Sequence, residues 1–273
     1  MFHKFTILCG CLVAAATAES VADTAEIQTF ENALAPAFQL QGREQQFNIT
    51  DRLKHHNVPG VSVALIENGD IAWAKAWGVR DNTTSEPATA GTLFQAASIS
   101  KPVAAFTALR MVDAGKLDLA APINTALTRW RVADNDFTRQ QPVTLEHILS
   151  HTAGMTVHGF PGYRLGSSYP TTIQILDGEA PANTSAIYVD TLPGSMWRYS
   201  GGGYTVLQLA MEDVTGMGFP ALTDSMALKP LGMDDSSFQT PPSEQDWPNL
   251  ATGHKRDGAP VDGKFYVHLE MAA

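Results

Sequence analysis

Apolar residues alternate with small or polar ones over positions 61–67 and again over positions 71–77, which is the period of a half-buried β-strand. The two runs are separated by Asn68-Gly69, a pair that favours the two positive φ angles of a type I′ turn. The pattern therefore predicts a β-hairpin over 61–77. Because a lone hairpin is not stable by itself, its sheet partners must come from other parts of the chain.

Helical signals prevail in most of the remaining chain. A helix is expected over about 43–56 and another over 98–114, where Pro102 is tolerable because it falls in the first turn. Apolar residues on one face predict a further helix over about 203–215, which Gly216 ends. Shorter helices are expected at 144–150, with Thr144 as the N-cap, and at about 219–228.

Two stretches carry weaker patterns. Residues 156–198 are rich in Gly, Pro, Ser and Thr and are interpreted as a long irregular segment. Few strand-like runs remain after Gly216, and residues 264–269 are the best of them. The predicted hairpin is therefore short of strand partners within this sequence.

The first residues have the pattern of an export signal. Lys4 precedes an apolar run over 5–18 that ends in Ala16-Thr17-Ala18, a small-x-small cleavage pattern. Residues 1–18 are therefore expected to be a signal peptide of a secreted or periplasmic protein, 19–42 a lead-in without a strong pattern, and 43–273 the main domain. A lipoprotein anchor at Cys11 is the less favoured alternative, because the apolar core before it is very short.

The two cysteines, Cys9 and Cys11, both lie inside this signal. The processed protein would have no thiol, which excludes a cysteine nucleophile, a thiolate metal site and a disulfide framework. The apolar run is shorter than the roughly 20 residues that span a bilayer. No other segment looks transmembrane, so an integral membrane protein is not expected.

Composition excludes some partners. The 273 residues are 44% hydrophobic and 17% charged, as in ordinary globular proteins of one or two domains. The formal net charge of −10 repels phosphate backbones, so nucleic acid is not an expected partner. Nothing in the sequence indicates an oligomeric state.

Candidate chemistry begins at Ser98-Ile99-Ser100-Lys101. Residues three apart on a helix face the same side, so Ser98 and Lys101 are expected to meet. A serine is a weak nucleophile until a base takes its proton, and a lysine can do so when burial lowers its pKa. The alternative is that Ser98 is a plain helix N-cap. Tyr199, at the mouth of the helix expected from 203, is a candidate proton relay beside the lysine.

Other reaction centres have less support. The sequence contains no Gly-x-Ser-x-Gly elbow and no His-Glu-x-x-His zinc motif. His151 is either a base for a different serine or a structural histidine, and the structural role is favoured. His55-His56 is expected to be a solvated pair at a helix end. No metal or organic cofactor is required.

Several short motifs occur in a fixed order, and they run from about residue 43 to the end: Val58-Pro59-Gly60-Val61, Asn68-Gly69, Ser98-Ile99-Ser100-Lys101, Leu149-Ser150-His151-Thr152-Ala153-Gly154-Met155, Pro193-Gly194, Tyr199-Ser200-Gly201 and Pro230-Leu231-Gly232-Met233. Together they resemble class C β-lactamases and the related penicillin-binding-protein-like serine hydrolases, which include D,D-peptidases, D-aminopeptidases and esterases.

The resemblance implies a fold and a reaction. The fold would be α/β, more closely α+β, of the β-lactamase/transpeptidase-like type: an antiparallel sheet flanked by helices, with a helical lobe inserted between its first and last strands. Ser98 would attack a carbonyl, Lys101 and Tyr199 would move the proton, and the Ser98 N–H would form half of an oxyanion hole. Water would then release the acyl group. The substrate would be a small molecule or peptidoglycan-derived: a β-lactam, an ester or a D-amino-acid peptide.

Two departures from the family pattern stand out. Gly201, a substrate-binding position, replaces the asparagine of the usual Tyr-x-Asn, which puts activity towards β-lactams in doubt. The sequence has no credible Lys-Thr-Gly or His-x-Gly third motif. The C-terminal strands and helix of relatives are therefore expected to be missing, and low activity is expected. The alternative is a non-catalytic family member that binds or is inactive.

Overall fold

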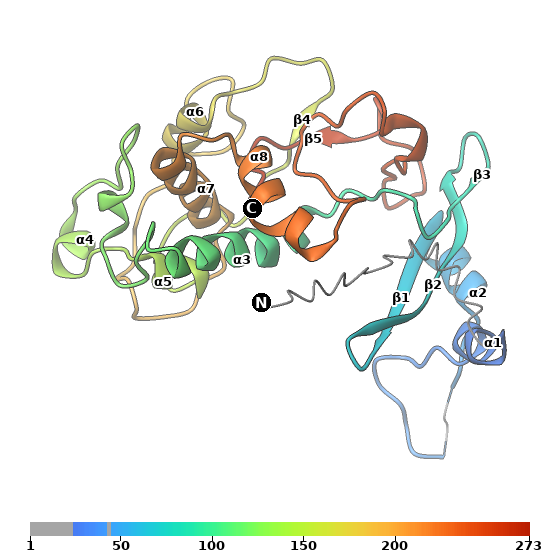
Figure 1. The fold of residues 1–273 in the computed structure, drawn as a ribbon. Helices are drawn as coiled ribbons and strands as arrows, with labels where there is room; N and C mark the ends of the chain where they lie inside the picture. Colours follow the sequence, from blue (N-terminus) through green and yellow to red (C-terminus); the bar gives the residue numbers. More distant parts are fainter. Residues whose placement is uncertain (1–23, 43–44) are drawn as a thin grey trace, which may run out of the picture.

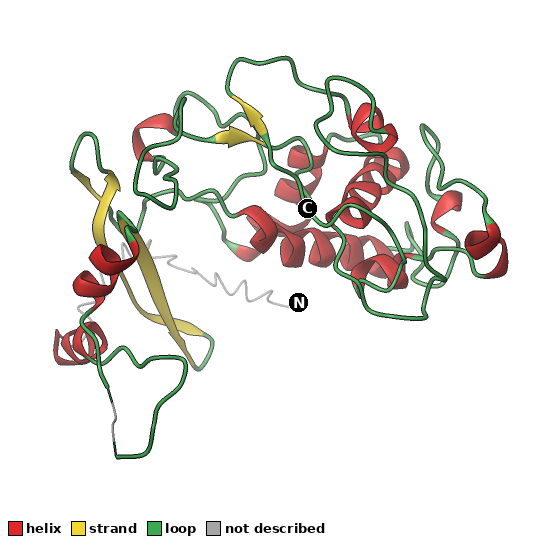
Figure 2. Cartoon of the chain, turned by 180° about the vertical axis from the view of Figure 1, so that it is seen from behind, coloured by secondary structure: helices red, strands yellow, loops and turns green. Residues whose placement is uncertain are grey.

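The computed structural model describes residues 24–42 and 45–273, so the expected signal peptide and both cysteines lie outside the described residues. A β-hairpin with two N-terminal helices forms one end of the molecule, and a larger helical lobe forms the other (Figure 1). A short two-stranded ribbon lies between them. Figure 2, seen from behind, shows the hairpin and its two helices at one end and the helical lobe at the other.

The hairpin is the element whose pattern was clearest in the sequence, and it is confirmed. Strand β1 (Gly60–Glu67) pairs antiparallel with β2 (Asp70–Asp81). Asn68 and Gly69 have φ angles of 53° and 92°, as the tight turn requires. The short β3 (Glu86–Pro87) pairs with the far end of β2.

Two helices cover the hairpin. In α1 (Thr24–Asn32), the Phe30 ring lies 5.3 Å from the ring of Trp73 in β2 and 5.6 Å from that of Trp77. Glu31 Oε1 in the same helix accepts a hydrogen bond from Trp77 Nε1 at 2.7 Å. The sequence of 19–42 had shown no strong pattern, because α1 is held by these aromatic contacts rather than by a regular apolar stripe.

Helix α2 (Ile49–His56) begins later than the expected 43–56. Its start is fixed by Asn48, whose side chain accepts hydrogen bonds from the N–H groups of Thr50 and Asp51. His55 and His56 lie in its last turn, and both are exposed, as expected.

The helical lobe is built on two long helices. α3 (Ser100–Asp113) and α7 (Gly201–Thr215) confirm the helices expected at 98–114 and 203–215. Every residue of α7 from Gly201 to Met211 is buried. Shorter elements surround the pair: α4 (Asp136–Gln140), α5 (Leu145–Leu149), α8 (Phe219–Thr223) and a π-helical turn at Asp224–Leu228.

The irregular segment expected over 156–198 contains two regular elements, so that expectation was wrong in part. Helix α6 (Thr172–Asp177) is closed by a capping box between Thr171 and Gln174 and by Gly178 at its C-terminus. Strand β4 (Tyr163–Arg164) pairs with β5 (Tyr266–Val267). The strand candidate at 264–269 thus forms a two-residue strand with β4 and adds nothing to the hairpin.

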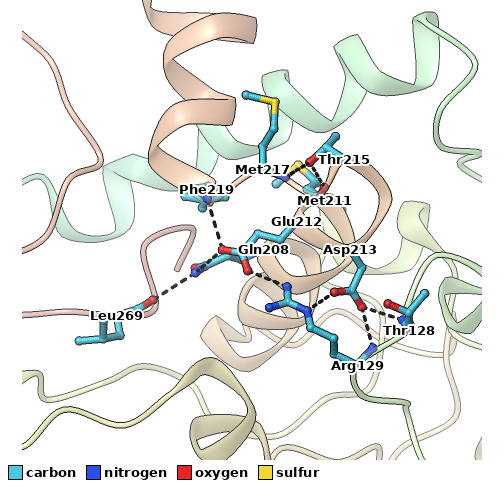
Figure 3. A network of polar contacts seen from close by, with 10 residues as sticks. All are labelled: Thr128, Arg129, Gln208, Met211, Glu212, Asp213, Thr215, Met217, Phe219 and Leu269. Carbon is cyan, nitrogen blue, oxygen red and sulfur yellow. Dashed lines mark hydrogen bonds and ion pairs between the residues drawn. The ribbon is translucent and has the colours of Figure 1, made fainter.

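Helix α7 also holds the C-terminal segment in position (Figure 3). Gln208 donates to the carbonyl of Leu269 at 3.2 Å and accepts from the N–H of Ala272 at 3.2 Å. Near the end of α7, Asp213 and Glu212 both bind Arg129. The two bonds of Gln208 hold residues 269–272 against the helix that begins beside Tyr199.

Within the described ranges, no helix has the length and apolar character that crossing a bilayer requires.

Candidate active site

Ser98 and Lys101 meet as their spacing predicts. Ser98 lies in a 3₁₀ turn over Ala97–Ile99 that leads directly into α3, and Lys101 is in the first turn of that helix. Lys101 Nζ donates to Ser98 Oγ at 3.1 Å. The lysine is only 5% exposed, whereas Ser98 is exposed. A buried amine thus holds a hydroxyl that substrate can reach.

The N-cap alternative for Ser98 is wrong. Neither the 3₁₀ turn nor α3 begins with a side-chain cap, and their N-cap positions are Ala96 and Ile99. The Ser98 hydroxyl is therefore not used to close a helix end.

Ala97 is a feature that the sequence analysis missed. Its φ angle is 46°, in the left-handed region that residues with a Cβ seldom occupy. Such a conformation costs on the order of 1–3 kcal/mol and persists only where its surroundings hold it. The strain lies directly before Ser98 and turns the chain sharply into the helix.

Tyr199 is brought to the same place from the other long helix. Ser200 is the N-cap of α7: its hydroxyl accepts from the Gly203 N–H at 2.9 Å and donates to the Thr156 carbonyl at 2.9 Å. This cap fixes the residue before it, so that Lys101 Nζ lies 4.8 Å from the centre of the Tyr199 ring.

The phenol of Tyr199 has a perturbed acidity. Burial by itself raises the pKa of Tyr199, but hydrogen bonds with Lys101 and Ser98, and the charge of Lys101, outweigh burial and lower the pKa below the ordinary value of a tyrosine. A phenol with a lowered pKa gives up and takes back a proton more readily near neutral pH. The structure thus brings together Ser98, Lys101 and Tyr199, the three residues that were expected to form the catalytic group.

Tyr204 and two histidines enclose this group. The Tyr204 ring lies 5.5 Å from Lys101 Nζ. The rings of His151 and His158 lie 4.4 and 4.8 Å from the Tyr199 ring. His151 Nδ1 accepts from the Ser200 N–H at 3.2 Å, in agreement with the favoured structural role. The contact of His158 with Tyr199 could not be predicted from the sequence, because the two residues are 41 positions apart.

A cavity of about 610 Å³ opens beside Ser98. Its walls include Lys101 and Gly201 on one side and the C-terminal segment on the other. Four carboxyl residues lie in its lining: Asp234, Asp235, Asp246 and Glu270. Among the residues that line it, Lys101 and His268 are the basic ones, and burial lowers the pKa of His268. The cavity therefore has an excess of negative charge.

Glu270 is a buried acid that the sequence analysis did not single out. It is 2% exposed, its Oε1 accepts from the Tyr163 hydroxyl at 3.5 Å, and its Oε2 has no hydrogen-bond partner. Burial raises its pKa to about 7.

Gly201 lies at the cavity wall and at the start of α7. A Cβ at this position would come within 3.1 Å of the His158 carbonyl and of the Phe160 ring. The segment 158–160 therefore packs closely against the start of α7, and the asparagine of the Tyr-x-Asn pattern that the resemblance implies would require that segment to move.

Within 24–42 and 45–273, no group of three or more His, Cys, Asp or Glu side chains is arranged to hold a metal ion.

A family model described as Beta-lactamase matches residues 46–268, which include Ser98, Lys101 and Tyr199. The chain belongs to the β-lactamase family. The resemblance found in the motifs is thereby confirmed, and so is the α+β fold of the β-lactamase/transpeptidase-like type.

Curated members of the β-lactamase family include relatives with different activities in their names. The chain is 32% identical over 198 residues to esterase EstB of Burkholderia gladioli, covering 68% of this chain and 48% of that protein. It is 30% identical over 185 residues to penicillin-binding protein 4 of Amycolatopsis lactamdurans, covering 68% of this chain and 46% of that protein. The chain spans about half the length of these relatives.

Solved structures of the β-lactamase fold agree. The hydrolase EstCE1, described as having promiscuous acyltransferase activity, matches 80% of this chain and 61% of its own with a TM-score of 0.61 and 26% identity. The D-alanine carboxypeptidase AmpC of Burkholderia cenocepacia matches 78% of this chain and 54% of its own with a TM-score of 0.58. The second match, at 21% identity, shows the fold alone.

Proposed function

We propose that the chain is a serine hydrolase that forms an acyl-serine intermediate at Ser98 and acts on uncharged esters in preference to β-lactams or D-amino-acid peptides. The observation that supports this most strongly is the hydrogen bond of 3.1 Å from buried Lys101 to exposed Ser98, with Tyr199 in contact with both. A nucleophile, an activating partner and a proton relay in mutual contact are what acyl transfer requires.

The reaction uses these groups in two steps. Ser98 Oγ attacks the carbonyl carbon while its proton passes to the phenolate of Tyr199, which the neighbouring ammonium of Lys101 stabilises. The carbonyl oxygen becomes an oxyanion that accepts from the Ser98 N–H. As the bond to the leaving alcohol breaks, the alcohol takes the proton from Tyr199. Water then attacks the acyl-serine through the same relay, and the acid leaves with Ser98 restored.

The charge of the cavity supports the preference for uncharged esters. Penicillins and peptides that end in D-alanine carry a carboxylate, and the three aspartates of the cavity lining repel it. Gly201 offers no side-chain amide to a substrate carbonyl. An uncharged ester with an apolar acyl group meets neither obstacle, and Phe94, Phe160 and Phe265 in the lining provide apolar surface for it.

The test compares kcat/KM for p-nitrophenyl butyrate, a chromogenic cephalosporin and an N-acylated peptide that ends in D-alanyl-D-alanine. The proposal expects the ester to have the highest kcat/KM, and Ser98→Ala to abolish its hydrolysis. Ser167→Ala, at an exposed serine outside the cavity lining, is the matched control and should retain the activity. A higher kcat/KM for the cephalosporin would contradict the substrate preference, and turnover that survives in Ser98→Ala would contradict the mechanism.

A non-catalytic role is the second candidate, and one observation favours it. Residues 201–273 contain no Lys-Thr-Gly or His-x-Gly sequence to supply the second oxyanion donor. Loss of one such donor costs about 10²–10³ in rate. A protein of this kind would be acylated at Ser98 without releasing the acyl group, so an adduct that persists for hours would favour this candidate over the hydrolase.

A further inference from the structure

We infer that His151 is a positioning residue that holds Tyr199 against Lys101, and that it does so only while its ring is neutral. The inference rests on the proposed function, because it assigns a consequence for the acylation of Ser98. It is carried by the contacts that His151 makes with residues 198–200.

His151 binds the segment on both sides of Tyr199. Its backbone carbonyl accepts from the Arg198 N–H at 2.8 Å, and its ring Nδ1 accepts from the Ser200 N–H at 3.2 Å. Between these two hydrogen bonds, the imidazole stacks on the Tyr199 ring, with centroids 4.4 Å apart and planes inclined by 31°. One residue thus fixes the backbone before Tyr199, the backbone after it and the ring itself.

The backbone of His151 is itself in an uncommon conformation. Its φ angle is 58°, in the left-handed region, where asparagine is tolerated much better than most residues with a Cβ. Such a conformation persists where the surrounding contacts hold it. Here it directs the carbonyl and the ring of the same residue to the same short segment.

Protonation would break this arrangement. The hydrogen bond from Ser200 needs a lone pair on Nδ1, so the neutral ring must carry its proton on Nε2. In the imidazolium both nitrogens carry protons, and the N–H of Nδ1 would then face the N–H of Ser200. The contact would change from attraction to repulsion, and the backbone N–H after Tyr199 would lose its acceptor.

The groups around the imidazole also oppose its protonation. It is faced by Lys101 from α3, by His158 from the segment after α5, and by the rings of Tyr199 and Tyr204 at the start of α7. Burial first, and then the charges of Lys101 and His158, lower the pKa of His151 below the ordinary value of a histidine. The neutral form therefore prevails at neutral pH, and the positioning contact is lost on acidification.

Two substitutions distinguish the role of the His151 hydrogen-bond acceptor from the role of its stacked ring. His151→Asn keeps an acceptor near the position of Nδ1, tolerates the left-handed backbone and does not titrate. His151→Phe keeps a ring but has no acceptor. The control is His158→Asn: the His158 ring also contacts Tyr199, but its hydrogen bond to the segment uses the backbone carbonyl, which accepts from the Gly201 N–H at 3.0 Å.

The experiment measures the rate of Ser98 acylation by a fluorophosphonate from pH 5 to pH 9 in the wild type and the three variants. The wild-type rate should fall on acidification with an inflection at the pKa of His151. In His151→Asn that inflection should disappear, in His158→Asn it should remain, and in His151→Phe the rate should be reduced at least tenfold at every pH. An unchanged acid inflection in His151→Asn would overturn the inference.

A second measurement does not depend on activity. In Ser98→Ala, nitrogen-15 NMR of the histidine rings should show His151 with its proton on Nε2, and the Ser200 amide resonance should shift with the titration of His151. If His151 carries its proton on Nδ1, or titrates while the Ser200 amide stays unmoved, the inference is wrong even where Ser98 is reactive. If the wild type is not acylated but the NMR result is as expected, the proposed function fails and the positioning contact stands.

Discussion

The amine of Lys101 lies 4.8 Å from the centre of the Tyr199 ring and 3.1 Å from the hydroxyl oxygen of Ser98. Two helices that are remote in sequence bring these groups together: α3 carries the lysine in its first turn, and α7 begins directly after the tyrosine and its cap. The candidate site is therefore a junction of two helix N-termini, and whatever fixes those two ends also fixes the geometry of the reaction.

Removal of the Tyr199 hydroxyl should slow the acylation of Ser98 without unfolding the protein. In Tyr199→Phe the ring can still stack on His151 and Lys101, but the group that accepts the serine proton is lost. The expected decrease in rate is about 10²–10⁴, measured with a reactive ester under single-turnover conditions.

Tyr204→Phe is the matched control for this prediction. The Tyr204 hydroxyl donates to the Leu149 carbonyl at 3.3 Å and its ring also lies near Lys101. Its loss should change the rate far less. Equal losses in the two variants would show that the Tyr199 hydroxyl has no special part in proton transfer.

The glycines at the start of α7 should differ sharply in their tolerance of alanine. A Cβ at Gly202 would lie 2.6 Å from the Thr156 carbonyl oxygen, whereas one at Gly203 would meet its nearest neighbour, Met155 Sδ, at 3.6 Å. Gly202→Ala is expected to reduce the free energy of unfolding by about 1–3 kcal/mol because it overpacks the core. Gly203→Ala should be neutral or stabilise by about 0.5 kcal/mol. Urea unfolding of both variants provides the comparison.

Glu270 should make the stability of the protein fall as the pH rises. The pKa of its carboxyl is raised from 4.5 to about 7 in the folded state. Between pH 4.5 and about 7, the Glu270 carboxyl is ionised in the unfolded chain and protonated in the folded protein. Proton binding therefore stabilises the folded state at low pH. The contribution is fully lost above pH 7 and amounts to about 3 kcal/mol. Glu270→Gln should remove this part of the pH dependence. Its free energy of unfolding, compared with that of the wild type at the same pH, should therefore be more favourable at pH 8 than at pH 5.

The control for this prediction is Glu67→Gln, which removes an exposed carboxylate at the end of β1. It should leave the slope of unfolding free energy against pH nearly unchanged. A slope in Glu270→Gln that equals that of the wild type would mean that Glu270 ionises normally in the folded protein.

A side-chain hydrogen bond joins the hairpin to the C-terminal segment, beside the backbone bond of 2.8 Å from the Thr252 N–H to the Arg80 carbonyl. Thr252 Oγ1 donates to Asp81 Oδ2 at 2.5 Å, and this bond, together with those from Thr83, lowers the pKa of Asp81 to about 2. The folded-state pKa is depressed, so its stabilisation is present above pH 3.8 and is lost as the pH falls towards 2. Asp81 is partly exposed, and after screening Thr252→Val should cost on the order of 1 kcal/mol at neutral pH. If Thr252→Val lowered the free energy of unfolding as much at pH 3 as at neutral pH, the effect would not come from the Asp81 carboxylate.

The sequence predicted those parts of the fold whose signals are local. The Asn68-Gly69 turn, the Thr144 cap and the apolar face of α7 each lie within a few residues, and the corresponding elements formed. Helix α1 could not be predicted in this way, because it depends on Phe30 meeting two tryptophans of β2. Strands β4 and β5 have only two residues each, and their pairing joins Tyr163 to Val267 and Arg164 to Tyr266, more than 100 residues apart, so no period marks either of them.

In the candidate site, too, local relationships could be predicted from the sequence and long-range ones could not. Ser98 and Lys101 were predicted to meet because one helical turn separates them, and Tyr199 entered through its position in a motif. The roles of His151, Ala97 and Glu270 depend on a backbone conformation or on burial by distant segments. The left-handed φ angle of Ala97 and the unpartnered oxygen of Glu270 have no counterpart in the pattern of residue types along the chain.

We propose above all that Ser98 is an activated nucleophile in this chain. The most direct test is to incubate the purified protein with a fluorophosphonate, and separately with a penicillin, and to record its intact mass, with Ser98→Ala as the control and circular dichroism to verify folding. We expect one fluorophosphonate adduct per chain that is absent from Ser98→Ala, and little or no penicillin adduct. A folded protein that forms no fluorophosphonate adduct, or one that forms it equally in Ser98→Ala, would contradict the claim.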